Sequence, residues 1–269
     1  MEVISVTFDT CSLDTVVWPQ TSQHENGETN GRKVRTAIEA GHVQGFFCEP
    51  LITLEGVQRK ERPEVLGSTR LETQFSSPDD RTINITIAVK QDRNPLPRKF
   101  CERIQVAQAI GMRALKGPAR IGWICVQDNE GTLFKSYGSV LELAARLDEV
   151  HDLATAIADR GVGHAVAVKL GLQFLTPDEI AKPTLWFEGL RRAQIKRERD
   201  QISRAIAEWA DGDSVATHYG HGIDLFCTED RAAQNAGQAS VLDPTNKAWL
   251  QGEYGIKFVS LAKLAEMLV

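Results

Sequence analysis

The chain has 269 residues, of which 42% are hydrophobic and 25% are charged, and its formal net charge is −5. A chain of this length and composition folds around a substantial core in one large or two small domains, and it is neither wholly disordered nor collagen-like nor a coiled coil. Because acids outnumber bases, a globally basic coat for nucleic acid is excluded, whereas a local basic patch is not.

Neither a membrane segment nor a disulfide framework is expected. No stretch approaches the ~20 apolar residues that cross a bilayer. Residues 1–9 hold two acids and lack the basic start of a secretory signal. The cysteines are odd in number, widely spaced and without a Cys-x-x-Cys pair. We therefore expect reduced thiols, a cytoplasmic location and no membrane partner.

Apolar periodicity predicts strands and helices in turn along the first half of the chain. The first strand places Ile4, Val6 and Phe8 on one face and ends at Asp9. The strand at 82–90 has the clearest pattern, because isoleucine or valine stands at every second position. The predicted elements are a strand at 2–9, a loop at 19–33, a helix at 32–40, a strand at 43–48, a helix at 51–62, a loop at 66–81, a strand at 82–90, a helix at 99–116 and a buried strand at 121–126.

The second half of the chain is richer in helices. Its predicted elements are a helix at 139–160, an apolar run at 164–170 that fits either a strand or a helix, helices at 183–210 and 213–221, a strand at 223–227, a turn with a short helix at 228–236, a strand at 257–260 and a helix at 261–268. Alternation of strands and helices over the whole chain predicts an α/β fold with a mainly parallel sheet.

Four acidic residues follow or flank the strands of such a sheet. Asp9 ends the first strand, and Asp230 follows the strand IDLFC. Glu55 lies in the helix after the second strand, and Asp213 begins a later helix. Open parallel sheets bind their ligands beyond the carboxyl ends of the strands, so Asp9 and Asp230 point to this edge. The helices of Glu55 and Asp213 are able to lean over it.

Converging carboxylates do not all stay ionised in one cleft without cations. Oxygen ligands without thiols suit Mg²⁺ or Mn²⁺, which orient a water molecule and neutralise the charge that builds on a phosphate. Each acid, taken singly, has a structural alternative as a strand end, a helix cap or a solvated residue. Glu49 is a rival to Glu55, and Asp211 is a rival to Asp213. We prefer Glu55, because it follows Pro50 at a helical position, and retain Asp213.

Short blocks at both ends of the chain resemble PIN-domain nucleases. DSVATHYGHGIDLFCTEDRA and YGIKFVSLAKLAEML resemble the end of that family, in which an acid at a helix start precedes a strand and then Thr-x-Asp. ISVTFDTC and CEPLITLEGV resemble its first strand with a terminal Asp and its second strand with an acidic helix. Carried over by position, the resemblance implies that Asp9, Glu55, Asp213 and Asp230 hold the metal and that Thr228 is the accompanying catalytic hydroxyl.

The resemblance covers residues 1–62 and 183–269, and it implies a PIN-like three-layer core with a mainly parallel central sheet. Residues 63–182 have no counterpart in the family pattern. We interpret them as an inserted α+β segment packed on the core, where it extends the sheet, covers the site or forms a docking surface.

Two basic clusters are candidates for contact with a nucleic-acid backbone. Arg59, Lys60 and Arg62 follow closely after Glu55 and are the predicted nucleic-acid-binding residues. The longer basic run at 191–204 is interleaved with acids that pair at i,i+4 spacing, which favours a solvated helix face.

Together these patterns predict a metal-dependent nuclease, and the resemblance alone implies an endoribonuclease acting on RNA. Water as the nucleophile leaves a 5′-phosphate and a 3′-hydroxyl. The alternative is a non-catalytic PIN-like scaffold that binds RNA or protein. A phosphatase of the haloacid dehalogenase type is disfavoured, because Asp9-Thr10-Cys11 lacks its Asp-x-Asp motif. The sequence is compatible with binding of an inhibitor or partner protein and with assembly into a homo-oligomer.

Overall fold

The structure, a computed structural model, describes residues 3–23, 26–79, 82–92, 96–118, 120, 140–181, 186–230 and 240–268. Within these residues the chain builds a five-stranded sheet of order β5-β2-β1-β6-β7, and each neighbouring pair in it is parallel. Its strands are β1 (Ile4–Phe8), β2 (Val43–Cys48), β5 (Arg113–Leu115), β6 (Leu225–Cys227) and β7 (Phe258–Val259). The predicted α/β class and mainly parallel sheet are confirmed.

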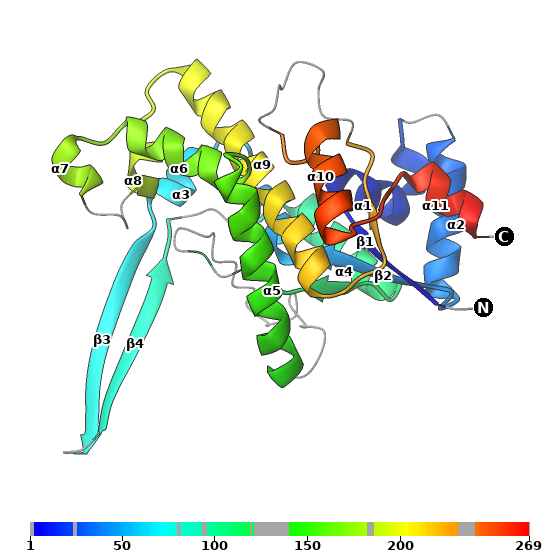
Figure 1. Cartoon of the computed structure of the whole chain (residues 1–269), viewed down its shortest axis with the longest axis horizontal. Coiled ribbons are helices and arrows are strands. Elements are labelled where there is room, and N and C mark those ends of the chain that lie inside the picture. The colour runs from blue at the N-terminus through cyan, green and yellow to red at the C-terminus, as the bar shows by residue number, and fades with distance from the viewer. Residues whose placement is uncertain are drawn as a thin grey trace.

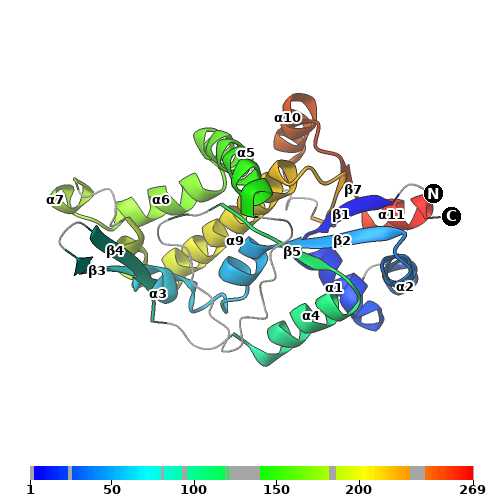
Figure 2. The same cartoon turned by 90° about the horizontal axis from the view of Figure 1, so that it is seen from below.

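Helices cover both faces of this sheet, giving three layers (Figure 2). One face is covered by α1 (Thr10–Val17), α2 (Gly27–Glu39), α4 (Arg98–Ala109) and α11 (Leu261–Met267). The other face is covered by α5 (Val140–Asp159), α9 (Lys196–Gly220) and α10 (Pro244–Tyr254). Side chains of β1 alternate between the two faces of the sheet. Val6 and Phe8 pack in the core beneath α1, α2, α4 and α11, whereas the Oγ1 atom of Thr7 lies 3.0 Å from Nδ1 of His218 on α9.

A smaller helical group extends the molecule beyond the sheet around the first half of α9 (Figure 1). It consists of α3 (Arg62–Gly67), α6 (His164–Gln173), α7 (Pro177–Ile180) and α8 (Trp186–Leu190). Ile202, Ile206 and Trp209 of α9 are fully buried and share a core with side chains of α3, α6 and α8. The long helix therefore joins this group to the sheet layer.

A two-stranded antiparallel hairpin stands apart from the sheet. β3 (Arg70–Asp79) pairs with β4 (Thr82–Lys90), and the ribbon projects away from the body of the molecule (Figure 1). The predicted strand at 82–90 is confirmed, but the predicted loop at 66–81 is wrong, since most of it forms β3. At Ile83 and Ile85 of β4 the apolar alternation does not mark a buried face, because these residues are 72% and 59% exposed.

Residues 63–182 contribute to the layers as well as to the hairpin. β5 pairs with β2 and is an edge strand of the central sheet, and α5 packs along α9. The helix predicted over 99–116 ends at Ala109, because Gly111 takes a φ of +99° and reverses the chain before β5. The predicted strand at 121–126 lies outside the described residues.

Other boundaries also differ from the sequence prediction. α2 begins at Gly27, within the predicted loop that also contains the 3-10 turn η1 (Pro19–Thr21). The helix predicted over 51–62 is replaced by a single π-helical turn, η2 (Leu51–Glu55), and then by α3. The helices predicted at 183–210 and 213–221 become α8 and the uninterrupted α9. The sequence analysis missed α10, and most of the short helix expected at 228–236 lies outside the described residues.

Candidate active site at the carboxyl edge of the sheet

The strand order places a switch point beside β1. From β1 the chain passes to β2 on one side and later returns to β6 on the other. Such a reversal in an open parallel sheet leaves a crevice beyond the carboxyl ends of the two diverging strands. Asp9 directly follows β1, Thr228 directly follows β6, and Asp230 comes two residues later, so these predicted residues share the crevice edge.

Hydrogen bonds tie the ends of β1 and β6 together. The Asp9 carboxylate caps α1 by accepting from the Ser12 backbone N–H at 2.7 Å, and its other oxygen accepts from the Thr228 hydroxyl. The backbone N–H of Asp230 in turn donates to the Thr228 hydroxyl oxygen at 3.0 Å. Burial raises the pKa of Asp9 from 3.8 to about 6. The charge of Glu55 also raises this pKa, whereas the hydrogen bonds from Thr228 and Ser12 lower it.

Glu55 reaches the same edge from η2. Its carboxylate accepts a hydrogen bond from the hydroxyl of Thr10, the residue after Asp9. Burial raises its pKa, and the Thr10 hydrogen bond and the charges of Arg62 and Arg103 oppose that shift. A π-helical turn is a local irregularity often found at functional sites, and here it ends at the acidic residue.

Asp211, the rival that the sequence analysis did not retain, is the fourth acid of this group. It lies on α9, and its pKa is raised well above 3.8, first by burial and then by the negative charges of Glu55, Glu208, Asp230 and Asp9. Asp9, Glu55 and Asp230 therefore lie within electrostatic reach of Asp211, and we call these four residues the acidic group.

Asp213, the residue chosen from the sequence, lies apart from this group and pairs with Arg120. Its side chain is buried and accepts from the Arg120 guanidinium at 3.0–3.1 Å and from the Trp209 indole N–H at 2.6 Å. The physical reason is that α9 is continuous, so Asp213 does not begin a helix but stands one turn after Trp209 on its buried side.

Glu49 is likewise held away from the acidic group, in agreement with the preference for Glu55. It directly follows β2, accepts from the Lys116 ammonium at 2.6 Å and from the Gly117 backbone N–H at 3.1 Å, and is buried. A buried carboxylate with a cation and a backbone donor is satisfied structurally.

A cation that the sequence analysis did not identify lies beside the acidic group. The Lys247 ammonium, on α10, donates to the backbone oxygen of Asp230 at 2.7 Å. Burial lowers its pKa, whereas the charges of Asp230, Asp9 and Asp211 raise it. The missed helix explains the missed residue, although Asp243-Pro244 before it and Gly255 after it are ordinary start and stop signals.

The predicted basic residues divide into exposed and buried ones. Arg59 and Lys60 are exposed. Arg62 is buried and donates to the backbone oxygens of Val57, Ser203 and Glu55, so it supports the fold and is not placed to contact nucleic acid.

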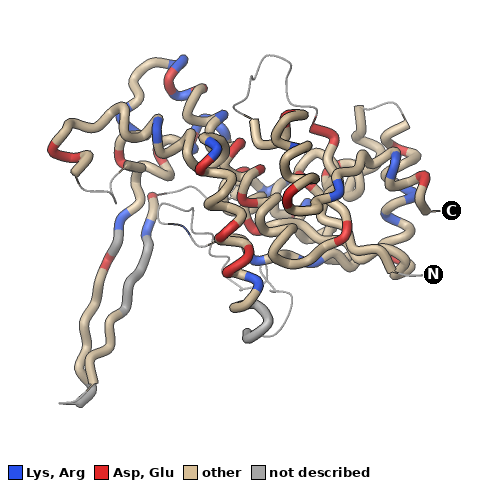
Figure 3. Tube along the Cα trace, viewed as in Figure 1, with Lys and Arg blue, Asp and Glu red and all other residues tan. Residues whose placement is uncertain are grey.

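Lys and Arg also gather around the start of α9 (Figure 3). There Arg192 pairs with Glu179, Lys196 with Asp200 and Arg199 with Glu64. These ion pairs agree with the solvated helix face expected for the run at 191–204.

The acidic group fits a divalent cation by its chemistry but is not arranged as a ligand cage. In the part of the chain that the structure describes, no three Asp, Glu, His or Cys side chains are placed to hold a metal ion. Asp9 and Glu55 each accept a threonine hydroxyl instead. The fit lies in the donor set, because burial raises the pKa values of Asp9, Glu55 and Asp211, neighbouring acids add to the shifts of Asp9 and Asp211, and a hard cation opposes both effects.

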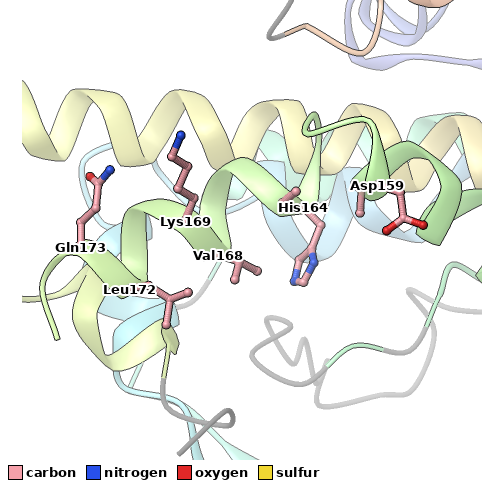
Figure 4. Close-up of a pocket in the computed structure, with 8 residues that line it drawn as sticks. Asp159, His164, Val168, Lys169, Leu172 and Gln173 are labelled. Atoms are coloured by element: carbon pink, nitrogen blue, oxygen red, sulfur yellow. The ribbon is translucent and has the colours of Figure 1, made fainter. Parts of the chain in front are cut away.

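A separate pocket of about 590 Å³ lies along α6. His164, Val168 and Leu172 follow one another along one side of that helix (Figure 4). Burial and the nearby Arg120 charge lower the pKa of His164 to about 3, so this ring stays neutral. No member of the acidic group lines this pocket.

Comparison with protein-family models, with curated proteins and with solved structures finds no match. No helix among the described residues is long and apolar enough to cross a membrane.

Proposed function

We propose that the chain is a metal-dependent endoribonuclease with a PIN-like fold, in which residues 63–182 are an addition to the family pattern. The observation that carries this proposal is the acidic group itself. Its acids come from separate elements near the switch point of a parallel sheet, and Glu55, Asp230 and Asp9 all act by charge on Asp211. Perturbed carboxylates in a cleft of this kind are typical of catalytic sites. The choice of RNA rests on the resemblance to PIN-domain nucleases.

Asp9, Glu55, Asp211 and Asp230 would hold Mg²⁺ or Mn²⁺. A bound ion of this kind orients a water molecule, lowers its pKa and neutralises charge on the phosphate. Thr228 fixes the orientation of the Asp9 carboxylate through its hydroxyl. Asp9, with a pKa of about 6, is largely deprotonated at neutral pH and available as a ligand.

A cytoplasmic location is part of the same proposal. The described cysteines, Cys11, Cys48, Cys101 and Cys227, are all free thiols. Free thiols, two of them in the core, suit a reducing compartment.

Replacement of Asp9 by Asn tests the proposal. Asp9→Asn keeps the shape of the side chain and removes a ligand charge, so we expect Mn²⁺-dependent cleavage of single-stranded RNA to fall by at least about 100-fold. Its thermal unfolding temperature without metal is expected to stay or rise, because a buried like charge is removed. Glu266→Gln, on the exposed surface of α11, is the matched control. Undiminished cleavage by Asp9→Asn and by Asp230→Asn contradicts the proposal.

A non-catalytic scaffold of the same fold is the second candidate. It is favoured by the absence, among the described residues, of three acids already placed as metal ligands. The same assay separates the two, because a scaffold binds RNA but leaves it intact in Mg²⁺ and in Mn²⁺.

A further inference from the structure

A second pocket adjoins the acidic group. It measures about 460 Å³, lies beyond the carboxyl ends of β6 and β7, and is closed on one side by α10. Thr228 and Asp230 belong to both the pocket and the site described above, so a molecule in the pocket would touch the proposed metal site. Its volume falls in the range of pockets that hold small ligands.

The pocket carries one cation, Lys247, among its described lining residues. Its ammonium is fixed by the backbone oxygen of Asp230 at 2.7 Å and lies 5.6 Å from the ring centroid of Phe258. An ammonium has three N–H donors, and its described hydrogen-bond partner here is a neutral carbonyl. Lys247 makes no direct ion pair with a described carboxylate, although the charges of Asp230, Asp9, Asp211 and Glu229 act on its ammonium.

The remaining walls are suited to a nucleotide rather than to an isolated ion. Leu242, Val259 and Phe258 contribute apolar surface, and Gln251 contributes an amide. Glu229 and Asp230 also line the pocket, and the Glu229 carboxylate accepts from the Leu261 backbone N–H at 2.7 Å. Single-stranded nucleic acid is bound by combining cations for the backbone with apolar and aromatic surface for the bases. A base is free to enter such a concave site when it is unpaired.

The acidic group also creates a need for this cation. Four carboxylates repel a polyanion, so a strand placed over them requires local positive charge. Arg62 is buried in the fold, and Arg192, Lys196 and Arg199 near the start of α9 are paired with acids. Arg59 and Lys60 are exposed but do not line this pocket. Lys247 is the described cation whose pocket is continuous with Asp230.

We propose that this pocket is the subsite for the nucleotide next to the cleaved bond, with Lys247 binding the phosphate of a single-stranded nucleic acid. The proposal rests on the function proposed above and names its substrate contact. Lys247 then acts in two opposite ways. It attracts the substrate, and it weakens the binding of a metal ion by the neighbouring carboxylates, since both carry positive charge.

The test compares Lys247→Gln with Lys247→Arg and with Lys263→Met, a surface control on α11. Binding of a short fluorescein-labelled single-stranded RNA is measured in EDTA at several salt concentrations, and Mn²⁺ binding is measured by calorimetry without RNA. We expect Lys247→Gln to weaken RNA binding about fivefold and to lower the salt slope by about 0.7, the value for one phosphate contact on a single strand. Mn²⁺ should bind more tightly to this variant, and Lys247→Arg and Lys263→Met should resemble the wild type.

The outcomes separate this inference from the proposed function. If Lys247→Gln keeps the RNA affinity and salt slope of the wild type while Asp9→Asn abolishes cleavage, the subsite is rejected and the nuclease stands. A lower unfolding temperature with an unchanged salt slope likewise rejects it, because Lys247 is then only structural. A wild-type protein that neither binds nor cleaves the RNA overturns both proposals.

Discussion

Two carboxylates on α9, separated by one residue, have opposite electrostatic surroundings. Asp213 faces Arg120 and accepts three of its N–H contacts, whereas Asp211 faces other acids. Residues i and i+2 of a helix point about 200° apart, so the two side chains lie on nearly opposite sides of α9. The balance of charge around a carboxylate, and not its burial alone, therefore distinguishes a functional acid from a structural one.

The two surroundings have different energetic consequences. A buried carboxylate that is paired and hydrogen-bonded supports the fold, and removing one partner leaves an uncompensated charge. A buried carboxylate among like charges costs stability and is retained where a ligand or a reaction uses it. The Arg120–Asp213 pair and the acidic group are therefore expected to respond to substitution with opposite signs.

The largest expected effect on stability is that of Asp213→Asn. The substitution leaves the Arg120 guanidinium buried without its anionic partner, at a cost of about 3–5 kcal/mol in the free energy of unfolding. Urea titration followed by circular dichroism measures this. A loss of less than about 1 kcal/mol in the free energy of unfolding would show that the Arg120–Asp213 ion pair contributes little to stability. Asp213 would then not differ from Asp211 in the way described above.

A second effect concerns pH and isolates Asp9. Its pKa in the folded protein is raised from 3.8 to about 6, so its stabilising contribution is complete below about pH 3.8 and is lost as the pH rises through about 6. Without metal, Asp9→Asn should therefore gain stability relative to the wild type between pH 4 and pH 7, by about 1–3 kcal/mol.

The measurement is the difference in free energy of unfolding between the two proteins at each pH in EDTA. Using the difference removes the contribution of His164 and His218, whose pKa values are lowered to about 3 by burial and whose effect has the opposite sign. Excess Mg²⁺ should favour the wild type at pH 7. A difference that does not change with pH contradicts the raised pKa of Asp9.

The smallest expected effect is on RNA binding by the exposed cations. Changing Arg59 and Lys60 together to Gln should weaken RNA binding modestly and lower its salt slope by about one to two units. Metal binding should be kept, because neither side chain belongs to the acidic group. The double variant Arg192→Gln with Lys196→Gln is the matched control, since these two residues pair with Glu179 and Asp200. An unchanged slope for the first variant would assign Arg59 and Lys60 to a solvated surface.

The sequence predicted strands at the positions of β1, β2, β6 and β7, whereas β5 falls within the helix predicted over 99–116. Ile4, Val6 and Phe8 alternate into a buried layer, and Asp9 stands where the strand ends. The hairpin shows the limit of that reasoning. The sequence of β3 predicts a loop, because Ser76, Ser77 and Pro78 interrupt its apolar pattern. The segment forms a strand by pairing with β4.

The preference for Asp213 over Asp211 rested on a sequence prediction of two helices, at 183–210 and 213–221. The structure has one continuous helix, α9, across the predicted break between them. The apolar period of Ile206 and Trp209 continues to Asp213, so the pattern already placed that residue on the buried side. What no local pattern contains is the partner, Arg120, which lies far away in the sequence.

The most direct test of the central claim compares Asp211→Asn with Asp213→Asn in one experiment. Mn²⁺ binding by calorimetry and RNA cleavage are measured for each variant and normalised to its folded fraction. The proposed site predicts that Asp211→Asn loses metal binding and cleavage by at least about 100-fold while staying folded, and that Asp213→Asn keeps both in its folded fraction. Retention of both by Asp211→Asn, or their loss from folded Asp213→Asn with Asp211→Asn unaffected, would contradict the assignment of the acidic group.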